Sequence, residues 1–194
     1  MISTLALWLL FVGYLVLAAF MGGERLLRRT ESAKTFRSGN FDKRSTALVG
    51  AGFGTGLLLP LALDFPGLFL FPVGLFEGIG AVAIMLAGLG LRVWAAATLG
   101  SHYSRTLLVA TDRKVVSSGP YARIRHPGYL GSILLWSGFG VLSSNLVVVS
   151  LFPIMFMAIY LYRISVEERM LDQEFGDDYA KYRQRTRKLV PLLY

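Results

Sequence analysis

The sequence predicts an all-α integral membrane protein with five transmembrane helices, the last two forming a tight helical hairpin, and no Rossmann sheet. Hydrophobic residues make up 54% of the 194 residues and charged residues only 16%, whereas soluble domains average about 45–50% and about 25%. Several long windows contain no charge, and the 20 Lys and Arg residues lie between or after these windows. We therefore expect residues 1–194 to form a single membrane domain.

Three N-terminal windows are long enough to cross a bilayer, and they assign residues 1–91 to three spans. Residues 2–21 and 46–63 contain no charged residue, and residues 72–91 contain only Glu77. A transmembrane helix needs about 17–25 predominantly apolar residues, so each window qualifies. The first window has no basic segment before it and a poor cleavage site after it, so we expect it to be retained and not removed as a signal peptide.

A continuous uncharged stretch, residues 128–162, predicts the helical hairpin. A single helix of this length would measure about 52 Å, which is too long for one crossing. Ser143, Ser144 and Asn145 lie near its middle, so we place the turn there, between a short arm at 128–142 and a second arm at 145–162. Pro153 is expected to kink the second arm.

The basic residues lie in alternate loops. Residues 22–45 contain seven, residues 92–127 contain six and residues 163–194 contain seven, which accounts for all 20. The positive-inside rule therefore places the N-terminus outside and the C-terminus in the cytoplasm. On a soluble fold a net charge of +8 would suggest nucleic acid. In this pattern it indicates membrane orientation and affinity for anionic headgroups, and no nucleic-acid partner is expected.

Polar and small residues within the spans have mainly structural interpretations. Glu77 lies about one turn from the outer end of its span, where it can reach water or a neighbouring helix, although an intramembrane acid is also a functional candidate. The alternating Gly50, Gly52, Gly54 and Gly56 follow no predicted strand. They therefore indicate helix packing and not a dinucleotide-binding loop. The chain has no cysteine, which excludes a disulfide or a thiolate nucleophile.

Residues 92–127 form a polar connector that is too long for an idle loop, and they contain both histidines, His102 and His126. Residues 115–121 suggest a short extended piece followed by a turn. Pro127 suits the first turn of a helix, which places His126 at the N-terminus of the fourth span. The free N–H groups and dipole of that terminus suit a carboxylate, although a helix start without a further function is an equally open interpretation.

Residues 163–194 are expected to form cytoplasmic helices that continue the fifth span. Arg163 and Glu167 lie four residues apart on one helix face. They form either a surface ion pair worth a few tenths of a kcal/mol or a pocket-lining pair that binds an anion and a cation or hydroxyl. Gly176 is expected to end this helix, and residues 178–187 form a second amphipathic stretch.

Three motifs in the C-terminal half carry a family resemblance. They are Gly119-Pro120-Tyr121-Ala122-Arg123-Ile124-Arg125-His126-Pro127-Gly128-Tyr129-Leu130-Gly131, then Glu167-Glu168-Arg169-x-Leu171, then Phe175-Gly176-x-x-Tyr179-x-x-Tyr182 with Pro191. In this order and spacing they resemble the isoprenylcysteine carboxyl methyltransferase family, whose members are integral membrane enzymes that use S-adenosylmethionine. The resemblance covers about residues 100–194 and suggests a small prokaryotic-type member.

The resemblance implies a cofactor site built from residues 100–194. It assigns the following residues to S-adenosylmethionine: Arg113, Lys114, Val115, Val116, Tyr121, His126, Pro127, Gly128, Tyr129 and Glu167. It places Arg163 at the family's substrate-side arginine, so Arg163 and Glu167 are the expected catalytic residues, and no metal is expected. Some members carry His-Thr where this chain has Arg113-Lys114, so the backbone and the two valines are expected to matter more there than the two basic side chains.

The implied activity is that of a protein-S-isoprenylcysteine carboxyl O-methyltransferase. The methyl group would pass from the sulfonium to the C-terminal α-carboxylate of a prenylated cysteine, leaving S-adenosylhomocysteine. Because an α-carboxyl group has a pKa of about 3.3–3.7, it is already ionised at neutral pH and needs no general base. The substrate is expected to be a prenylated protein or a small prenylthiol acid that arrives through the bilayer. The enzyme would lie in the plasma membrane of a prokaryote or the endoplasmic reticulum of a eukaryote.

Two related enzyme classes and a non-enzymatic membrane protein stay open as alternatives. A phospholipid N-methyltransferase would need a base for its amine, and only His102 and His126 are evident, which is a weak argument against it. A sterol-type reductase would bind NADPH, and such relatives are usually longer and have more spans. A non-enzymatic protein would have no reason to place Arg163, Glu167 and His126 at one interface.

Overall fold

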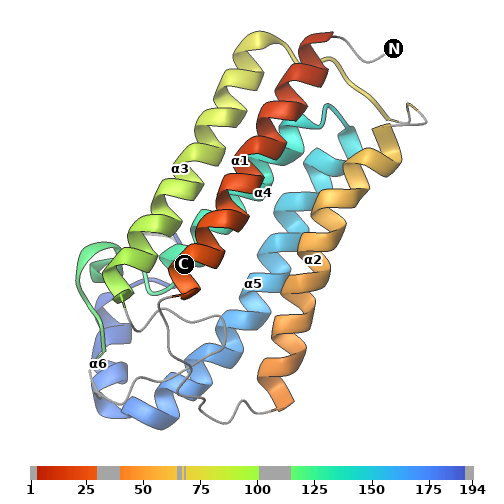
Figure 1. Cartoon of the computed structure of the whole chain (residues 1–194). Helices are drawn as coiled ribbons and strands as arrows, with labels where there is room; N and C mark the ends of the chain where they lie inside the picture. Colours follow the sequence, from red (N-terminus) through yellow and green to blue (C-terminus); the bar gives the residue numbers. More distant parts are fainter. Residues whose placement is uncertain (1–3, 30–39, 65–66, 68, 101–114, 191–194) are drawn as a thin grey trace.

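The computed structural model describes residues 4–29, 40–64, 67, 69–100 and 115–190 (Figure 1). Apart from two isolated β-bridges, the regular structure in these ranges is helical. The elements in chain order are α1 (Thr4–Arg29), α2 (Asn40–Asp64), α3 (Leu75–Leu99), the 3₁₀ turn η2 (Gly119–Ala122), α4 (Pro127–Leu142), α5 (Leu146–Phe175) and α6 (Asp177–Arg185). The predicted all-α class without a Rossmann sheet is confirmed for this part of the chain.

Five of these helices correspond to the five predicted spans. Helices α1, α2, α3 and α5 are long and apolar enough to cross a membrane, whereas α4 is a shorter apolar helix of 16 residues. At 1.5 Å per residue α4 is about 24 Å long, less than the roughly 30 Å hydrocarbon core. The chain is therefore a multi-pass membrane protein with four span-length helices and one shorter one.

Several helices continue beyond the uncharged windows that predict them. Helix α1 extends to Arg29, α3 extends to Leu99, and α5 continues from the bilayer segment to Phe175. The window ends where the first charge appears, but helical hydrogen bonding does not have to end there. Gly176 terminates α5 with a φ of 49°, a conformation that favours glycine, as predicted.

The predicted hairpin between α4 and α5 is confirmed. The Asn145 side chain caps α5 by accepting hydrogen bonds from the backbone N–H groups of Val147 and Val148 at 3.1 and 3.4 Å. The same turn pairs with the loop between α2 and α3, because the Phe71 N–H donates to the Ser144 carbonyl at 2.9 Å. The two loops without basic residues therefore lie at one end of the bundle, opposite α6 (Figure 1).

Close approach of α3 and α4 depends on glycine. Gly88 of α3 and Gly131 of α4 face each other so closely that a Cβ on either would meet the other's backbone carbonyl. A Cβ at Gly138 would likewise lie 2.6 Å from the Ala81 carbonyl oxygen. These small residues bring the helix backbones into contact, as is typical of packing within membranes.

The expected packing role of the α2 glycines holds for two of the four. A Cβ at Gly52 would lie 2.7 Å from Ile159, and one at Gly56 would lie 2.5 Å from the Trp136 ring, whereas Gly50 and Gly54 have open space beside them. The helical period explains this difference, since residues four apart share a face.

Glu77 lies exposed in the first turn of α3, in agreement with its structural interpretation. The position is electrostatically favourable, because the N-terminal end of a helix carries partial positive charge.

Candidate active site

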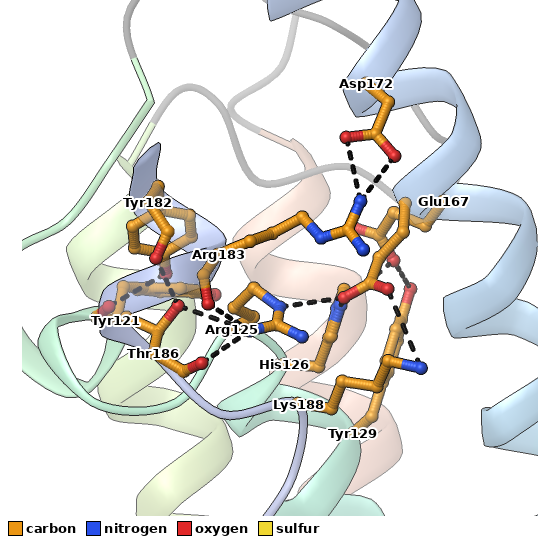
Figure 2. Close-up of polar contacts among 11 residues, drawn as sticks. Tyr121, Arg125, His126, Tyr129, Glu167, Asp172, Tyr182, Arg183, Thr186 and Lys188 are labelled. Carbon is orange, nitrogen blue, oxygen red and sulfur yellow. Dashed lines mark hydrogen bonds and ion pairs between the residues drawn. The ribbon is translucent and has the colours of Figure 1, made fainter. Parts of the chain in front are cut away.

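Polar side chains gather where the start of α4, the C-terminal part of α5 and residues 182–188 meet (Figure 2). The backbone holds two of these segments together. The Arg125 N–H donates to the Arg187 carbonyl at 2.7 Å, and the His126 N–H donates to the Lys188 carbonyl at 3.1 Å. The chain after α6 is therefore fixed alongside the residues that lead into α4.

His126 immediately precedes α4, which begins at Pro127 as predicted. Its carbonyl accepts from the N–H groups of Tyr129 and Leu130 at 3.1 and 3.2 Å. Its side chain is buried, with Nδ1 3.8 Å from Glu167 and Nε2 3.4 Å from one Glu168 oxygen. The imidazole therefore lies between two carboxylates of α5 and connects the start of α4 to that helix.

Tyr129 connects the two residues that the sequence predicts as catalytic. Its hydroxyl donates to Glu167 Oε2 at 2.7 Å and accepts from Arg163 Nε at 2.9 Å. Arg163 is only 5% exposed, and its Nη1 donates to the hydroxyls of Ser45 and Thr46 on α2 at 3.1 and 3.2 Å. Because Arg163 is buried, a solvated surface ion pair does not describe it.

Glu168 is a second carboxylate in this region, and it is 7% exposed. It accepts a hydrogen bond from Arg125 Nε at 2.8 Å, and its other oxygen lies 3.9 Å from Lys188 Nζ. The sequence motif contains Glu168, but helical periodicity favours Glu167, which shares a face with Arg163. The partners of Glu168, which are Arg125 and Lys188, lie far from it in sequence, so local spacing does not reveal them.

Arg125 and Tyr182 hold the turn before α4 against the C-terminal segment. Arg125 Nη1 donates to the carbonyls of Thr186 and Arg183 at 2.6 and 3.2 Å. The Tyr182 hydroxyl donates to the Tyr121 carbonyl at 2.8 Å. Burial raises the pKa of Tyr182 to about 12, so its phenol stays protonated and can donate this bond at neutral pH.

A buried ion pair also lies beneath this region, and the sequence does not predict it. Arg92 of α3 donates through Nε to Glu24 of α1 at 2.6 Å, and Glu24 is 5% exposed. Arg92 Nη1 also donates to the Gly128 carbonyl and to the Ser132 hydroxyl of α4, both at 2.9 Å. The pair thus ties α1 and α3 to the first turns of α4. The sequence assigns Arg92 to a loop because the apolar window 72–91 ends at the preceding residue.

The structure brings together four predicted site residues: His126, Tyr129, Arg163 and Glu167. Pro127 and Gly128 lie in the same first turn of α4, and Tyr121 reaches this region through Tyr182.

The other four predicted cofactor residues are residues 113–116, of which the structure describes only the two valines. Val115 and Val116 are half-buried ahead of η2. Arg113, Lys114 and His102 lie outside the described residues. Among the side chains that the structure describes, no group of three or more His, Asp and Glu is arranged to hold a metal ion.

Comparison with known proteins adds sequence relatives. Residues 81–173 match the model of the isoprenylcysteine carboxyl methyltransferase (ICMT) family. The protein-S-isoprenylcysteine O-methyltransferase of Schizosaccharomyces pombe is 32% identical over 117 residues, which cover 58% of this chain and 49% of that protein. Protein-S-isoprenylcysteine O-methyltransferase A of Arabidopsis thaliana is 28% identical over 157 residues, covering 77% of this chain and 78% of that protein. The cobalt-zinc-cadmium resistance protein CzcN of Cupriavidus metallidurans is 31% identical over 115 residues, covering 59% and 49%.

A solved structure has the same fold. It is the eukaryotic intramembrane Ras methyltransferase ICMT, with a TM-score of 0.69, 24% identity and coverage of 95% of this chain and 67% of that one. The chain spans about half the length of several curated relatives that it matches. The family match, the relatives and the shared fold agree with the motifs around His126 and Glu167. Through residues 81–173, just under half of its length, the chain is similar to the isoprenylcysteine carboxyl methyltransferase family.

Proposed function

We propose that this chain transfers a methyl group from S-adenosylmethionine to the α-carboxylate of a prenylated cysteine at the membrane surface. One observation carries the proposal. A buried guanidinium and a partly exposed carboxylate, those of Arg163 and Glu167, are hydrogen-bonded to the same hydroxyl at the end of an apolar helical bundle. A guanidinium suits an anionic acceptor, and a carboxylate suits the hydroxyl and ammonium groups of the methyl donor.

The residues near Glu167 fit the methyl donor chemically. The Glu167 side chain is 25% exposed, so it is accessible to ribose hydroxyls or to the amino group. Tyr121, Val115 and Val116 are half-buried and offer apolar surface to an adenine ring. Bound S-adenosylmethionine would supply an electrophilic methyl group on a sulfonium.

The start of α4 would receive the carboxylate of the donor. The N–H groups of Tyr129 and Leu130 already donate to the His126 carbonyl, which leaves the Gly128 N–H as the preferred donor for this purpose. The favourable end of the helix dipole supports the same assignment. The His126 ring faces Glu167 and Glu168, so we assign it to holding these carboxylates in place.

Arg163 would bind the carboxylate of the substrate. That carboxylate is ionised at neutral pH, so the protein has to position it and shield it from water without removing a proton. In this proposal the substrate competes with the hydroxyls of Ser45 and Thr46 for the guanidinium. The exchange is favourable, because hydrogen bonds to a carboxylate are stronger than those to a neutral hydroxyl.

The apolar surface of the bundle suits a lipid-modified substrate. Large hydrophobic side chains such as Trp8, Phe76 and Ile154 are 63%, 85% and 69% exposed, as expected for helices that face lipid tails. A prenyl chain would reach the site from the bilayer, and the basic loops would place that site on the cytoplasmic side. A prenylated protein and a small prenylthiol acid both satisfy this chemistry.

A labelling experiment tests the proposal. The purified protein in lipid nanodiscs is incubated with S-adenosylmethionine carrying a radiolabelled methyl group, and with either N-acetyl-farnesylcysteine or phosphatidylethanolamine. We expect label in the farnesylated acid as a base-labile ester that releases methanol. Label in phosphatidylethanolamine alone would instead support the phospholipid N-methyltransferase alternative. Stabilisation by NADPH, with none by S-adenosylhomocysteine, would support a reductase.

A further inference from the structure

We infer that Tyr129 is a positioning residue that fixes Arg163 and Glu167 relative to each other, and so sets how the methyl acceptor and the methyl donor meet. The inference rests on the proposed function, because it assigns the acceptor to Arg163 and the donor to Glu167. It adds that a single hydroxyl, that of Tyr129, sets the positions of both Arg163 and Glu167.

The ring of Tyr129 is held firmly in one orientation. It stacks on His126, with ring centroids 5.7 Å apart and planes 7° apart, and on Tyr160, with centroids 5.0 Å apart and planes 23° apart. The Arg163 guanidinium carbon lies 5.9 Å from the ring centroid. Because both neighbours pack against its faces, the ring cannot swing without disturbing buried side chains, and its hydroxyl has a fixed position.

The two hydrogen bonds of this hydroxyl have only one possible direction. A guanidinium can only donate and a carboxylate can only accept, so the phenol must accept from Arg163 and donate its single proton to Glu167. Both bonds involve a charged partner, which makes them stronger than bonds between neutral groups. Arg163 and Glu167 share the Tyr129 hydroxyl as a hydrogen-bond partner. A shift of that hydroxyl toward one of them therefore changes its bond to the other.

This arrangement has a consequence for the kinetics. Arg163 and Glu167 lie on α5, whereas Tyr129 lies on α4, so the hydroxyl also fixes the approach of the two helices at the reacting centre. A misplacement of about 1 Å in a reacting group can reduce the rate about 100-fold. Loss of the hydroxyl should therefore affect turnover and the binding of both ligands together.

Tyr129→Phe is the direct test, since it keeps the stacked ring and removes only the hydroxyl. We expect a roughly 10–100-fold lower kcat, a severalfold higher KM for N-acetyl-farnesylcysteine and a severalfold higher Kd for S-adenosylhomocysteine. A residue with a purely structural role would reduce the folded fraction and the melting temperature, while the folded protein kept its KM and Kd.

Tyr14→Phe is the matched control. The Tyr14 hydroxyl donates to the Leu57 carbonyl at 2.9 Å and joins α1 to α2, so this variant also loses one tyrosine hydroxyl that links two helices. Tyr14 lies outside the proposed site, and we expect its variant to keep the wild-type KM, Kd and kcat. If Tyr129→Phe does not fold, 3-fluorotyrosine introduced at position 129 keeps the shape and changes the acidity of the hydroxyl, and we expect it to change both KM and Kd.

The outcomes separate the inference from the proposed function. Active wild-type protein together with a folded Tyr129→Phe variant of unchanged kcat, KM and Kd would overturn the inference alone. The same holds for a 3-fluorotyrosine protein with unchanged constants. Wild-type protein that neither binds S-adenosylhomocysteine nor methylates the farnesylated acid would overturn the proposed function, and the inference with it.

Discussion

The two ends of the helical bundle are built in different ways. At the end near α6, buried charged side chains from distant segments meet, as in the contacts between Arg125 and Glu168 and between Arg92 and Glu24. At the opposite end, backbone hydrogen bonds and the Asn145 cap hold the two loops together, and the Asn145 side chain also donates to the buried Asp64 carboxylate at 3.2 Å. The same helices therefore end in a charged network on one side and in local turn structure on the other.

Under the proposed function, this difference would separate the residues that support the reaction from those that support the fold. Burying charge is costly in a membrane protein, and the buried side chains of Glu24, Arg163 and Glu168 lie at the α6 end, whereas Asp64 is buried at the other. Substitutions at the α6 end should change both activity and stability. Substitutions at the opposite end should change stability alone.

The largest expected effect is on activity at the α6 end. Arg163→Ala and Glu167→Ala should each reduce methyl transfer by at least about 100-fold, because they remove the groups proposed to hold the acceptor and the donor. Size-exclusion profiles and melting curves should show that both variants still fold. Normal turnover in either variant would remove that residue from the reaction.

The next largest effect is expected on stability, at the ion pair between Arg92 and Glu24. Arg92→Leu removes the cation beside the buried Glu24, and breaking a buried pair costs about 3–5 kcal/mol. We expect the double variant Glu24→Leu/Arg92→Leu to be more stable than Arg92→Leu, since it no longer buries an uncompensated carboxylate. Unfolding in detergent micelles measures both variants. A double variant that is less stable than Arg92→Leu would show that the loss of Arg92 does not leave Glu24 as an uncompensated buried charge.

A smaller effect is expected at the opposite end. Asn145→Ala removes the side-chain cap of α5, a loss that costs about 0.5–2 kcal/mol of stability, and it also removes the hydrogen bond to Asp64. Because Asn145 lies at the other end of the bundle, the folded variant should methylate its substrate at the wild-type rate. A specific loss of turnover would link the hairpin turn to the site and remove the distinction between the ends.

The smallest effect is expected for Glu77. It is exposed in the first turn of α3, where the partial positive charge of the helix terminus favours a carboxylate. Glu77→Gln should match the wild type in melting temperature and in kcat/KM. A marked loss of activity would reveal a functional acid at the end of the bundle that we assign to the fold.

The comparison also explains which features the sequence could predict. The uncharged windows predict the apolar helices and the hairpin, because each depends on local composition and length. Pro127 and Gly176 mark the start of α4 and the end of α5, because each residue has a specific backbone preference. Arg163 and Glu167 are identified by helical spacing together with the family motifs.

Long-range partners could not be predicted in the same way. Glu24 contacts Arg92 across 68 residues, and Arg163 contacts Ser45 across 118 residues. No local period connects such pairs, since they meet only after the helices have packed. The third apolar window also ends just before Arg92, so the sequence places this residue in a loop although α3 includes it. The charged network at the α6 end therefore becomes visible only in three dimensions.

The most direct test of this account is the thermal stabilisation that S-adenosylhomocysteine gives to three proteins: wild type, Glu167→Ala and Asn145→Ala. A ligand that binds only the folded state raises the melting temperature, and the increase grows with the logarithm of the ligand concentration divided by its Kd. We predict a clear increase for the wild type, the same increase for Asn145→Ala from its lower starting point, and little or none for Glu167→Ala. Equal increases in all three proteins, or none in the wild type, would contradict the assignment of the α6 end as the site of the methyl donor.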